Sequence, residues 1–270
     1  MTTAPGNLAE PPSTTTVPLT RSPTRSCMST GPVCTGSAAP DMGDIGTYYG
    51  LLRRVHEVLK PQRYLEIGVH RGHSLALVRP ETHAVGVDPE PMVEDPPDNA
   101  VIVPATSDDF FANPDLFGLL GGPVDLVFVD GLHLYEQALR DVANVERQSN
   151  PHGFILIHDC LPIDAETSTR EQNSMIWSGD VWKVVVALRR HRPDLTVTTV
   201  DVEPTGLAIV SGLDPDNTVL FDRYTEIVDE LHDLTFEDLR TAGRSTMLNV
   251  ISDDWETVKP LLTFNRDSSD

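Results

Sequence analysis

The chain has 270 residues, enough for one large domain with attachments. Its formal net charge is −21, because 41 acidic residues outnumber 20 lysines and arginines. An acidic surface repels a phosphate backbone unless basic residues cluster, so the composition argues against a nucleic-acid partner. The one dense basic run, residues 189–192, precedes Pro193 and is typical of a helix C-terminus, where cations suit the helix dipole.

The cysteines and the hydropathy pattern exclude several other classes. Cys27, Cys34 and Cys160 lack zinc-ligand spacing, and a disulfide framework is not expected in a chain this long. No apolar run reaches the roughly 18 residues that a membrane-spanning helix needs. The N-terminus also lacks the charged start and apolar stretch of a secretory signal. We therefore expect a cytoplasmic location and no membrane partner.

The first 40 residues differ in composition from the rest of the chain. Ser, Thr and Pro occupy 21 of these positions, and no apolar periodicity is present. Such a segment cannot bury enough surface to offset its ordering entropy, so we predict a disordered leader over residues 1–40. Met28 and Met42 leave open a later translation start.

From residue 41 to residue 212, helix and strand patterns alternate. Apolar stripes at helical spacing lie at 48–59, 74–78, 135–145 and 181–188. Short apolar runs typical of buried strands lie at 64–69, 84–88, 101–103, 124–130, 153–157, 195–200 and 207–210. Strands separated by helices imply right-handed crossovers. We therefore predict an α/β domain with a Rossmann-like, doubly wound, mostly parallel sheet and helices on both faces.

Residues 213–270 change character again. An acidic amphipathic helix is predicted over 224–234, and Thr235 with Asp238 resembles the capping box of another. We interpret this region as a C-terminal helical extension. It either packs on the sheet edge, covers the site as a lid, or forms a contact in a homodimer.

A glycine-rich turn follows the first strand and reads Glu66-Ile-Gly68-Val-His-Arg-Gly72-His-Ser74. Glycines at 68 and 72 permit a sharp turn and the close approach of a ligand. Asp88 lies 20 residues after Gly68 at the end of the next strand, where an acid accepts hydrogen bonds from ribose hydroxyls. The turn therefore predicts a nucleotide-like ligand at the sheet edge.

The same turn argues against a dinucleotide. His70 stands where the dinucleotide pattern G-x-G-x-x-G has its second glycine. Glu66 would repel a diphosphate but would favour a cationic amino-acid ligand. These two residues favour S-adenosylmethionine, which carries an ammonium and a sulfonium but no phosphate.

Two aspartates mark the expected chemical site. Asp130 and Asp159 each end a predicted strand, and consecutive strands joined by one helix are expected to be neighbours, about 4.8 Å apart. Both carboxylates would reach the carboxyl edge of the sheet, where hard oxygen ligands suit Mg²⁺ or a similar divalent cation. The simpler interpretation is that either aspartate caps the following helix.

His133 is the candidate general base. It lies three residues after Asp130 on the loop that enters the next helix, and an unperturbed histidine titrates near pH 6.5. Alternatively, His133 only caps or orients Asp130. His158 precedes Asp159, and strand alternation predicts that its side chain points the other way.

These motifs resemble class I S-adenosylmethionine-dependent methyltransferases. The 66–72 turn looks like motif I and Val87-Asp88 like motif II. Asp130-Gly-Leu-His133-Leu-Tyr135 and Gly153-Phe-Ile-Leu-Ile-His158-Asp159 are similar to signatures of a bacterial small-molecule and sugar O-methyltransferase branch, the methyltransferase domain 24 type. The resemblance spans roughly residues 45–210 and implies a seven-stranded sheet. The cofactor-binding residues we expect are Glu66, Gly68, Gly72, Ser74, Asp88, Ser107, Asp108 and Asp130.

The resemblance also bears on the metal. Candidate metal ligands are Asp130, Asp159 and His158. In the related catechol methyltransferases the second acidic signature ends Asp-Asn, whereas this chain has Asp159-Cys160, and a thiol is a poor Mg²⁺ ligand. Either His133, His158 or water completes the shell, or no metal binds and His133 acts alone as base.

We therefore expect an O-methyltransferase that acts on a hydroxyl of a small molecule, with Asp130 and His133 as catalytic residues. The resemblance favours a sugar or glycosylated metabolite over a catechol. A non-catalytic binding protein of the same fold stays open, and a nicotinamide-dependent enzyme is disfavoured by the glycine pattern. The polar 161–180 stretch is a candidate lid, and acceptor contacts are expected from it, from 41–50 and from the C-terminal helices.

Overall fold

The computed structural model describes residues 45–263, and the predicted leader and alternative starts lie outside this range. The strands form one sheet in the order β3-β2-β1-β4-β5-β7-β6-β8. Only β7 runs antiparallel to its neighbours. The strands are β1 (Arg63–Ile67), β2 (His83–Asp88), β3 (Ala100–Pro104), β4 (Val124–Val129), β5 (Ser149–His158), β6 (Thr196–Asp201), β7 (Leu207–Ser211) and β8 (Val250–Ser252).

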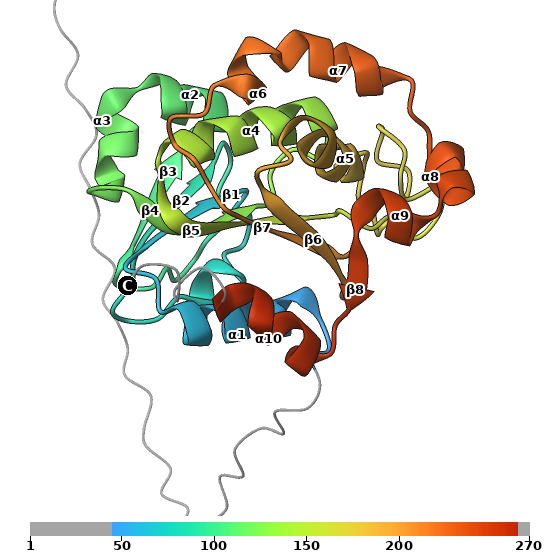
Figure 1. The fold of residues 1–270 in the computed structure, drawn as a ribbon. Coiled ribbons are helices and arrows are strands. Elements are labelled where there is room, and N and C mark those ends of the chain that lie inside the picture. The colour runs from blue at the N-terminus through green and yellow to red at the C-terminus, as the bar shows by residue number, and fades with distance from the viewer. Residues whose placement is uncertain (1–44, 264–270) are drawn as a thin grey trace, which may run out of the picture. The chain divides into compact units, whose positions relative to one another are not determined.

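Helices cover both faces of this sheet (Figure 1). Successive residues of β4 alternate between two cores: Val127 packs in the core that includes α4 and α5, and Phe128 in the core that includes α1. The doubly wound, mostly parallel α/β fold is therefore confirmed. The helices are α1 (Tyr48–Leu59), α2 (Ser107–Ala112), α3 (Pro114–Phe117), α4 (Tyr135–Arg147), α5 (Trp182–His191), α6 (Val219–Asp222), α7 (Tyr224–His232), α8 (Phe236–Ala242), α9 (Arg244–Leu248) and α10 (Trp255–Thr263).

The helix expected after the glycine-rich turn does not form. The chain makes only a short 3₁₀ turn, η1 (Leu75–Leu77), before β2 begins at His83. Pro80 explains the difference, because proline disfavours a helical conformation at the residue before it and lacks a backbone donor. The turn is therefore not followed by the N-terminus of a long helix.

Within residues 45–263 the sheet has eight strands instead of the expected seven, and the eighth comes from the C-terminal extension. β8 pairs parallel with β6, with Val200 opposite Ile251. The extension is therefore not purely helical. Its capping box is present, since Thr235 and Asp238 hydrogen-bond each other's backbone N–H at the start of α8.

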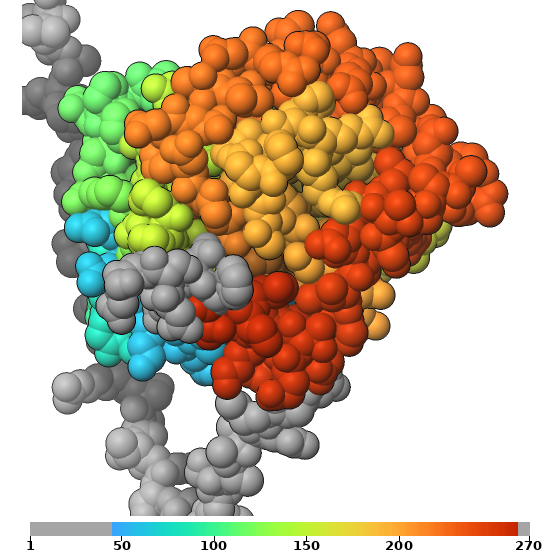
Figure 2. Space-filling view, in the orientation of Figure 1, coloured from blue at the N-terminus to red at the C-terminus, as the bar shows by residue number. Residues whose placement is uncertain are grey.

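The extension packs on both faces of the sheet. Leu231 of α7 is buried in the core beside α5, and Val258 of α10 is buried in the core beside α1. In Figure 2 the red atoms of the C-terminal residues lie beside the blue atoms of α1. No helix in residues 45–263 has the length and apolarity to cross a membrane. A dimer contact through this extension stays a prediction.

Candidate active site

A cavity of about 870 Å³ opens at the carboxyl edge of the sheet. Its walls come from the start of α1, the β1–β2 turn, the start of α2, the β4–α4 segment, the end of β5 and the 161–180 loop. All described lining residues fall between Tyr48 and Thr205, so the C-terminal extension contributes none of them. Of the predicted site residues, those that line the cavity are Gly68, Ser74, Asp88, Ser107, Asp108, Asp130, His133, His158 and Asp159.

The β1–β2 turn is fixed by backbone conformation and by one carboxylate. Gly68 has φ +86°, and a Cβ there would lie 1.9 Å from the Asp130 carbonyl oxygen, so only glycine fits. His70 adopts φ 47° and donates its N–H to Asp88 Oδ2 at 2.8 Å. Glu90 donates its N–H to the other Asp88 oxygen, also at 2.8 Å. Asp88 therefore holds the turn as well as facing the cavity.

Gly72 and Glu66 lie behind the cavity wall. Gly72 has φ +77° and packs against Val93. Glu66 is fully buried, and its carboxyl group accepts hydrogen bonds from Ser74 Oγ at 2.6 Å and Tyr64 Oη at 2.7 Å. Burial raises the pKa of Glu66 to about 8, although both hydrogen bonds oppose the rise. Glu66 therefore reaches the cavity only through Ser74.

A polar cluster lies at the α2 end of the cavity. Ser107 and Asp108, expected as a turn, form the first turn of α2. Gln137 donates to both of them and to Asp141 Oδ1, at 3.1–3.3 Å. Asp141 is 1% exposed, and burial raises its pKa to about 6. Gln137 and Asp141 belong to no motif that marked them in the sequence, although their i, i+4 spacing on α4 places them on one helix face.

The two predicted aspartates meet at the other end of the cavity. Asp130 follows β4 and Asp159 follows β5, and these strands are parallel neighbours, as expected. His133 Nε2 lies 3.2 Å from Asp159 Oδ2 and 3.7 Å from Asp130 Oδ1. His133 Nδ1 lies 2.8 Å from the Trp177 carbonyl oxygen. A carbonyl only accepts, so Nδ1 carries the proton and Nε2 faces the carboxylates.

His158 points into this cluster and not away from it, which corrects the alternation argument. Its Nδ1 lies 3.1 Å from Asp130 Oδ1 and 3.4 Å from Asp159 Oδ2. The strand ends at His158, and Asp159 adopts the left-handed φ of 60°. This turn in the backbone breaks the alternation and brings both side chains to one place.

The histidines and aspartates of the cluster stabilise each other's charged forms, but two of their buried atoms make no hydrogen bond. Burial lowers the pKa of His158, but Asp130 and Asp159 outweigh it and hold that pKa well above its ordinary value. Burial raises the pKa of Asp159, but His158 and His133 lower it below its ordinary value. Asp159 Oδ1 accepts from Thr205 at 2.5 Å, whereas Oδ2 and His158 Nε2 are buried without a hydrogen-bond partner. Asp159 Oδ2 still has the charge of His158 Nδ1 at 3.4 Å, whereas His158 Nε2 is a buried donor whose desolvation is costly unless a ligand meets it.

The donor set fits a divalent cation. In residues 45–263, Asp130, His133 and Asp159 form a group whose ligand atoms all lie within 4.8 Å of one another. Two carboxylates and an imidazole suit a hard or borderline ion, and the bond from His133 Nδ1 to a carbonyl is the support that metal-binding histidines need. His158 lies beside this group, bonded to Asp130.

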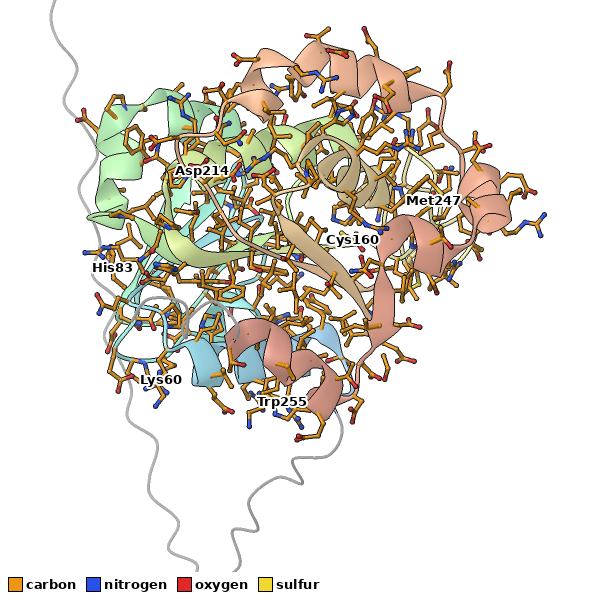
Figure 3. The ribbon with its side chains drawn as sticks, in the orientation of Figure 1. Lys60, His83, Cys160, Asp214, Met247 and Trp255 are labelled. Atoms are coloured by element: carbon orange, nitrogen blue, oxygen red, sulfur yellow. The ribbon has the colours of Figure 1, made fainter. Side chains whose placement is uncertain are left out.

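Cys160 takes no part in the cluster. Its side chain is fully buried in the sheet interior, where Figure 3 labels it. The thiol donates to the carbonyls of Ile157 and His158, and burial raises its pKa far above the ordinary value. The difference from an Asp-Asn signature therefore removes one oxygen ligand without placing a sulfur in the site.

Aromatic and apolar groups close the acidic end of the cavity. The ring of Tyr48 lies 4.0 Å from that of His158, and the ring of Trp177 stacks on His133 at 4.9 Å. At the tip of the 161–180 loop, Met175 is fully exposed and Ile176 is 45% exposed. The polar stretch expected to face the acceptor thus presents its apolar residues to the cavity. No sequence motif marked Tyr48 or Trp177.

Comparisons with known proteins agree with the fold and the turn. Residues 65–160 match the family model of a methyltransferase domain. No curated protein matches the sequence. Among solved structures, cofactor-bound Rv0187 from MTB is 17% identical with a TM-score of 0.50, covering 67% of this chain and 84% of that one.

Two further solved structures are similar at lower TM-scores. The O-methyltransferase TomG from Streptomyces achromogenes, in complex with SAM, is 18% identical with a TM-score of 0.48, covering 61% and 78% of the two chains. An O-methyltransferase from Bacillus cereus in complex with SAH is 13% identical with a TM-score of 0.46, covering 64% and 83%. The matched segment contains the glycine-rich turn from Gly68 and Asp88, so residues 65–160 are similar to a methyltransferase domain.

Proposed function

We propose that the protein transfers the methyl group of S-adenosylmethionine to a hydroxyl of a small molecule. The observation that carries this proposal is the meeting of Asp130, His133 and Asp159 in the same cavity as the Gly68–Asp88 turn. A bound sulfonium and a deprotonating group in one cavity are what O-methylation needs.

The reaction is an in-line displacement at the methyl carbon. The bond from sulfur to methyl breaks while the bond from acceptor oxygen to methyl forms, and the hydroxyl proton must leave. Holding oxygen, methyl and sulfur nearly collinear supplies much of the rate. His133 Nε2, with Nδ1 committed to the Trp177 carbonyl, is free to take the proton. Asp159 at 3.2 Å and Asp130 at 3.7 Å then stabilise the imidazolium.

We also propose a divalent cation at this site. Asp130, His133 and Asp159 would hold it, and Asp159 Oδ2, which makes no hydrogen bond, would become a ligand. Such an ion, when bound, lowers the pKa of an acceptor hydroxyl. His133 cannot offer Nε2 to a metal and to a proton at once. With the ion bound, the hydroxyl proton would pass to solvent, while His158, whose Nδ1 lies beside both carboxylates, would balance their charge.

The preferred acceptor class rests on the family resemblance, which favours a sugar or glycosylated metabolite. A catechol is a second candidate, and a specific observation favours it. Tyr48, Trp177 and the exposed Met175 and Ile176 give this end of the cavity flat and apolar walls. Such walls suit an aromatic ring, although sugar rings also stack on aromatic side chains.

Two measurements test the proposal. We expect S-adenosylmethionine to raise the unfolding temperature and NAD to leave it unchanged, since a ligand at 100 times its Kd stabilises by about 2.7 kcal/mol. Equal or absent shifts would contradict the cofactor assignment. Transfer of an isotope-labelled methyl group to matched panels of catechols and glycosides then identifies the acceptor. Label found on nitrogen or carbon in place of oxygen would contradict O-methylation.

A further inference from the structure

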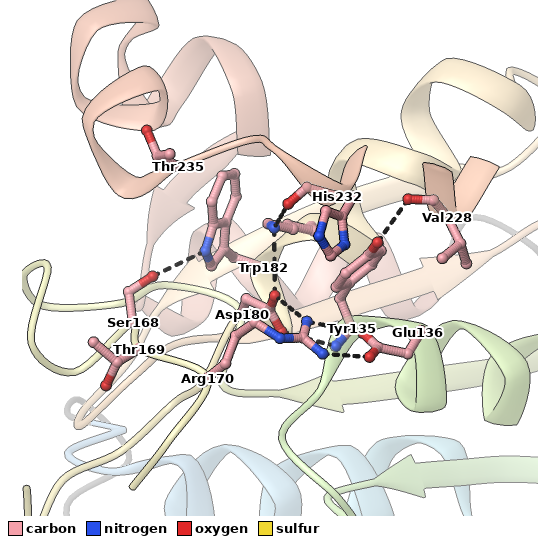
Figure 4. A network of polar contacts seen from close by, with 12 residues as sticks. Tyr135, Glu136, Ser168, Thr169, Arg170, Asp180, Trp182, Val228, His232 and Thr235 are labelled. Atoms are coloured by element: carbon pink, nitrogen blue, oxygen red, sulfur yellow. Dashed lines mark hydrogen bonds and ion pairs between the residues drawn. The ribbon is translucent and has the colours of Figure 1, made fainter. Parts of the chain in front are cut away.

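A chain of contacts connects the 161–180 loop to His133. Arg170 lies in this loop and pairs with two acids, Glu136 at the start of α4 and Asp180 at the loop's end. The bond from Arg170 Nη1 to Asp180 Oδ2 is 2.7 Å, and that to Glu136 Oε2 is 3.0 Å. Figure 4 shows the guanidinium between these two carboxylates. Planar two-sided pairing of this kind fixes geometry as well as charge.

Asp180 also connects the loop to the start of α4. Its side chain is 4% exposed, and its Oδ1 accepts from the backbone N–H of Tyr135 at 3.0 Å. Lys183 lies 3.3 Å from Asp180 Oδ2 and donates to the carbonyl of His232. Asp180, and not Asp130, therefore satisfies a free N–H at the start of the helix that follows His133.

The next link runs from Arg170 to Trp177. Thr169, adjacent to Arg170, accepts a hydrogen bond from the Trp177 indole N–H at 2.5 Å. Ser178 donates both its N–H and its hydroxyl to the carbonyl of Thr167. These bonds cross the loop from one side to the other. The position of the indole is thus set by the part of the loop that Arg170 holds.

The last link is His133 itself. Trp177 stacks on its ring, with 25° between the planes, and accepts from its Nδ1 at 2.8 Å. Gly179, with φ +55°, packs so closely on His133 that a Cβ there would lie 1.8 Å from its carbonyl oxygen. Ring plane and tautomer of His133 therefore both depend on the loop.

We propose that Arg170 and Trp177 are positioning residues that act through His133. Methyl transfer then requires that the 161–180 loop be held by the ion pairs of Arg170 with Glu136 and Asp180, which we call the latch. This inference rests on the proposed function, because it assumes that His133 Nε2 serves the reaction. Arg170 does not line the cavity, which separates its effect from acceptor contact. Trp177 lines the cavity and both touches and orients His133.

A double-mutant cycle tests the proposal. Arg170→Gln should lower kcat about tenfold, because a small misplacement of a reacting group is costly, while the Kd for S-adenosylmethionine stays within twofold. In a His133→Ala background the same change should have no further effect on kcat, since the group it positions is absent. Equal losses in both backgrounds would overturn the proposal, as would an unchanged kcat in Arg170→Gln.

Conservative and control variants sharpen this test. Arg170→Lys keeps the charge but loses the planar fork, so it should recover part of the loss. Trp177→Phe keeps a stacked ring but not the bond to Thr169, so a partial loss is expected. Arg240→Gln breaks an exposed Arg–Glu pair on α8, outside the cavity lining, and should change nothing.

A readout without turnover separates this inference from the proposed function. In protein with ¹⁵N-labelled histidine, the Nδ1–H of His133 should give a protected proton resonance, assigned by its loss in His133→Ala. Faster solvent exchange of this proton in Arg170→Gln, but not in Arg240→Gln, supports the latch. Equal exchange in both overturns it. If no acceptor is ever methylated, the proposed function fails while this measurement still decides the latch.

Discussion

The two ends of the cavity differ in how their polar groups are satisfied. At the β1–β2 turn, Glu66 bonds to Ser74 and Tyr64, and Asp88 bonds to two backbone N–H groups. At the ends of β4 and β5, Asp159 Oδ2 and His158 Nε2 are buried without hydrogen bonds. Every polar group named at the first end is hydrogen-bonded, whereas the second end keeps two buried polar atoms that make no hydrogen bond. Binding is expected from the first end and proton or metal chemistry from the second.

The largest effect should come from removing a cation. We expect EDTA to suppress turnover by about 10³-fold, because a Lewis acid at the acceptor oxygen is worth several kcal/mol. Asp159→Asn, which keeps the shape of the side chain, should match that loss. Full activity in EDTA would remove the metal from the mechanism and leave His133 as the sole base.

His133→Ala should lower kcat by about 10²-fold, at the lower end of the usual contribution of general acid–base catalysis. The Kd for S-adenosylmethionine should change less than twofold, because the turn at the other end is untouched. His83→Ala, on β2 beside Leu119, is the matched control. A loss in kcat shared by both variants would argue against a role for His133.

Asp88→Ala should act on binding. It removes the expected ribose acceptor and frees the N–H groups of His70 and Glu90, so Kd for the cofactor should rise about 10- to 100-fold. Asp125→Ala is the control, since its carboxylate also accepts two backbone N–H groups, at the opposite end of the sheet. Titration calorimetry of both variants separates lost stability from lost binding.

The last prediction concerns the free energy of unfolding as a function of pH, and not activity. The pKa of Glu66 is raised from 4.5 to about 8, so the folded protein binds a proton there that the unfolded chain releases. Stability from this group is fully present below pH 4.5 and is lost as pH rises towards 8, by at most about 1.4 kcal/mol per pH unit. Glu66→Gln should flatten that decline in urea titrations. Glu57→Gln, at an exposed position, is the control and should decline like the wild type. If the stability of Glu66→Gln falls with pH as steeply as that of the wild type, Glu66 is already ionised in the folded protein.

The patterns of apolar residues in the sequence predicted the features that depend on local structure alone. The parallel sheet and the meeting of Asp130 with Asp159 followed from apolar runs that each end in an acid. The direction of His158 could not be predicted, because it depends on the left-handed φ of Asp159. β8 was not predicted, because three residues between two helices are too few to show the alternation of apolar and polar residues that is typical of a strand.

Tertiary contacts account for the remaining omissions. Tyr48 and Trp177 reach the cavity from segments far apart in the sequence, and neither belongs to a motif. The polar composition of 161–180 suggested a polar face. In the folded protein, Arg170 uses its charge on Glu136 and Asp180, and the tip turns Met175 and Ile176 to the cavity.

The way the 161–180 loop is anchored has a consequence for the evolution of acceptor choice. Its fixed points are Arg170 and the paired Thr167 and Ser178, whereas Met175 at the tip is fully exposed. Substitutions at the tip can therefore alter the shape offered to an acceptor without moving the residues that hold His133. A lineage, or a saturation library at 174–176, can explore new acceptors while the methyl-transfer step is inherited intact.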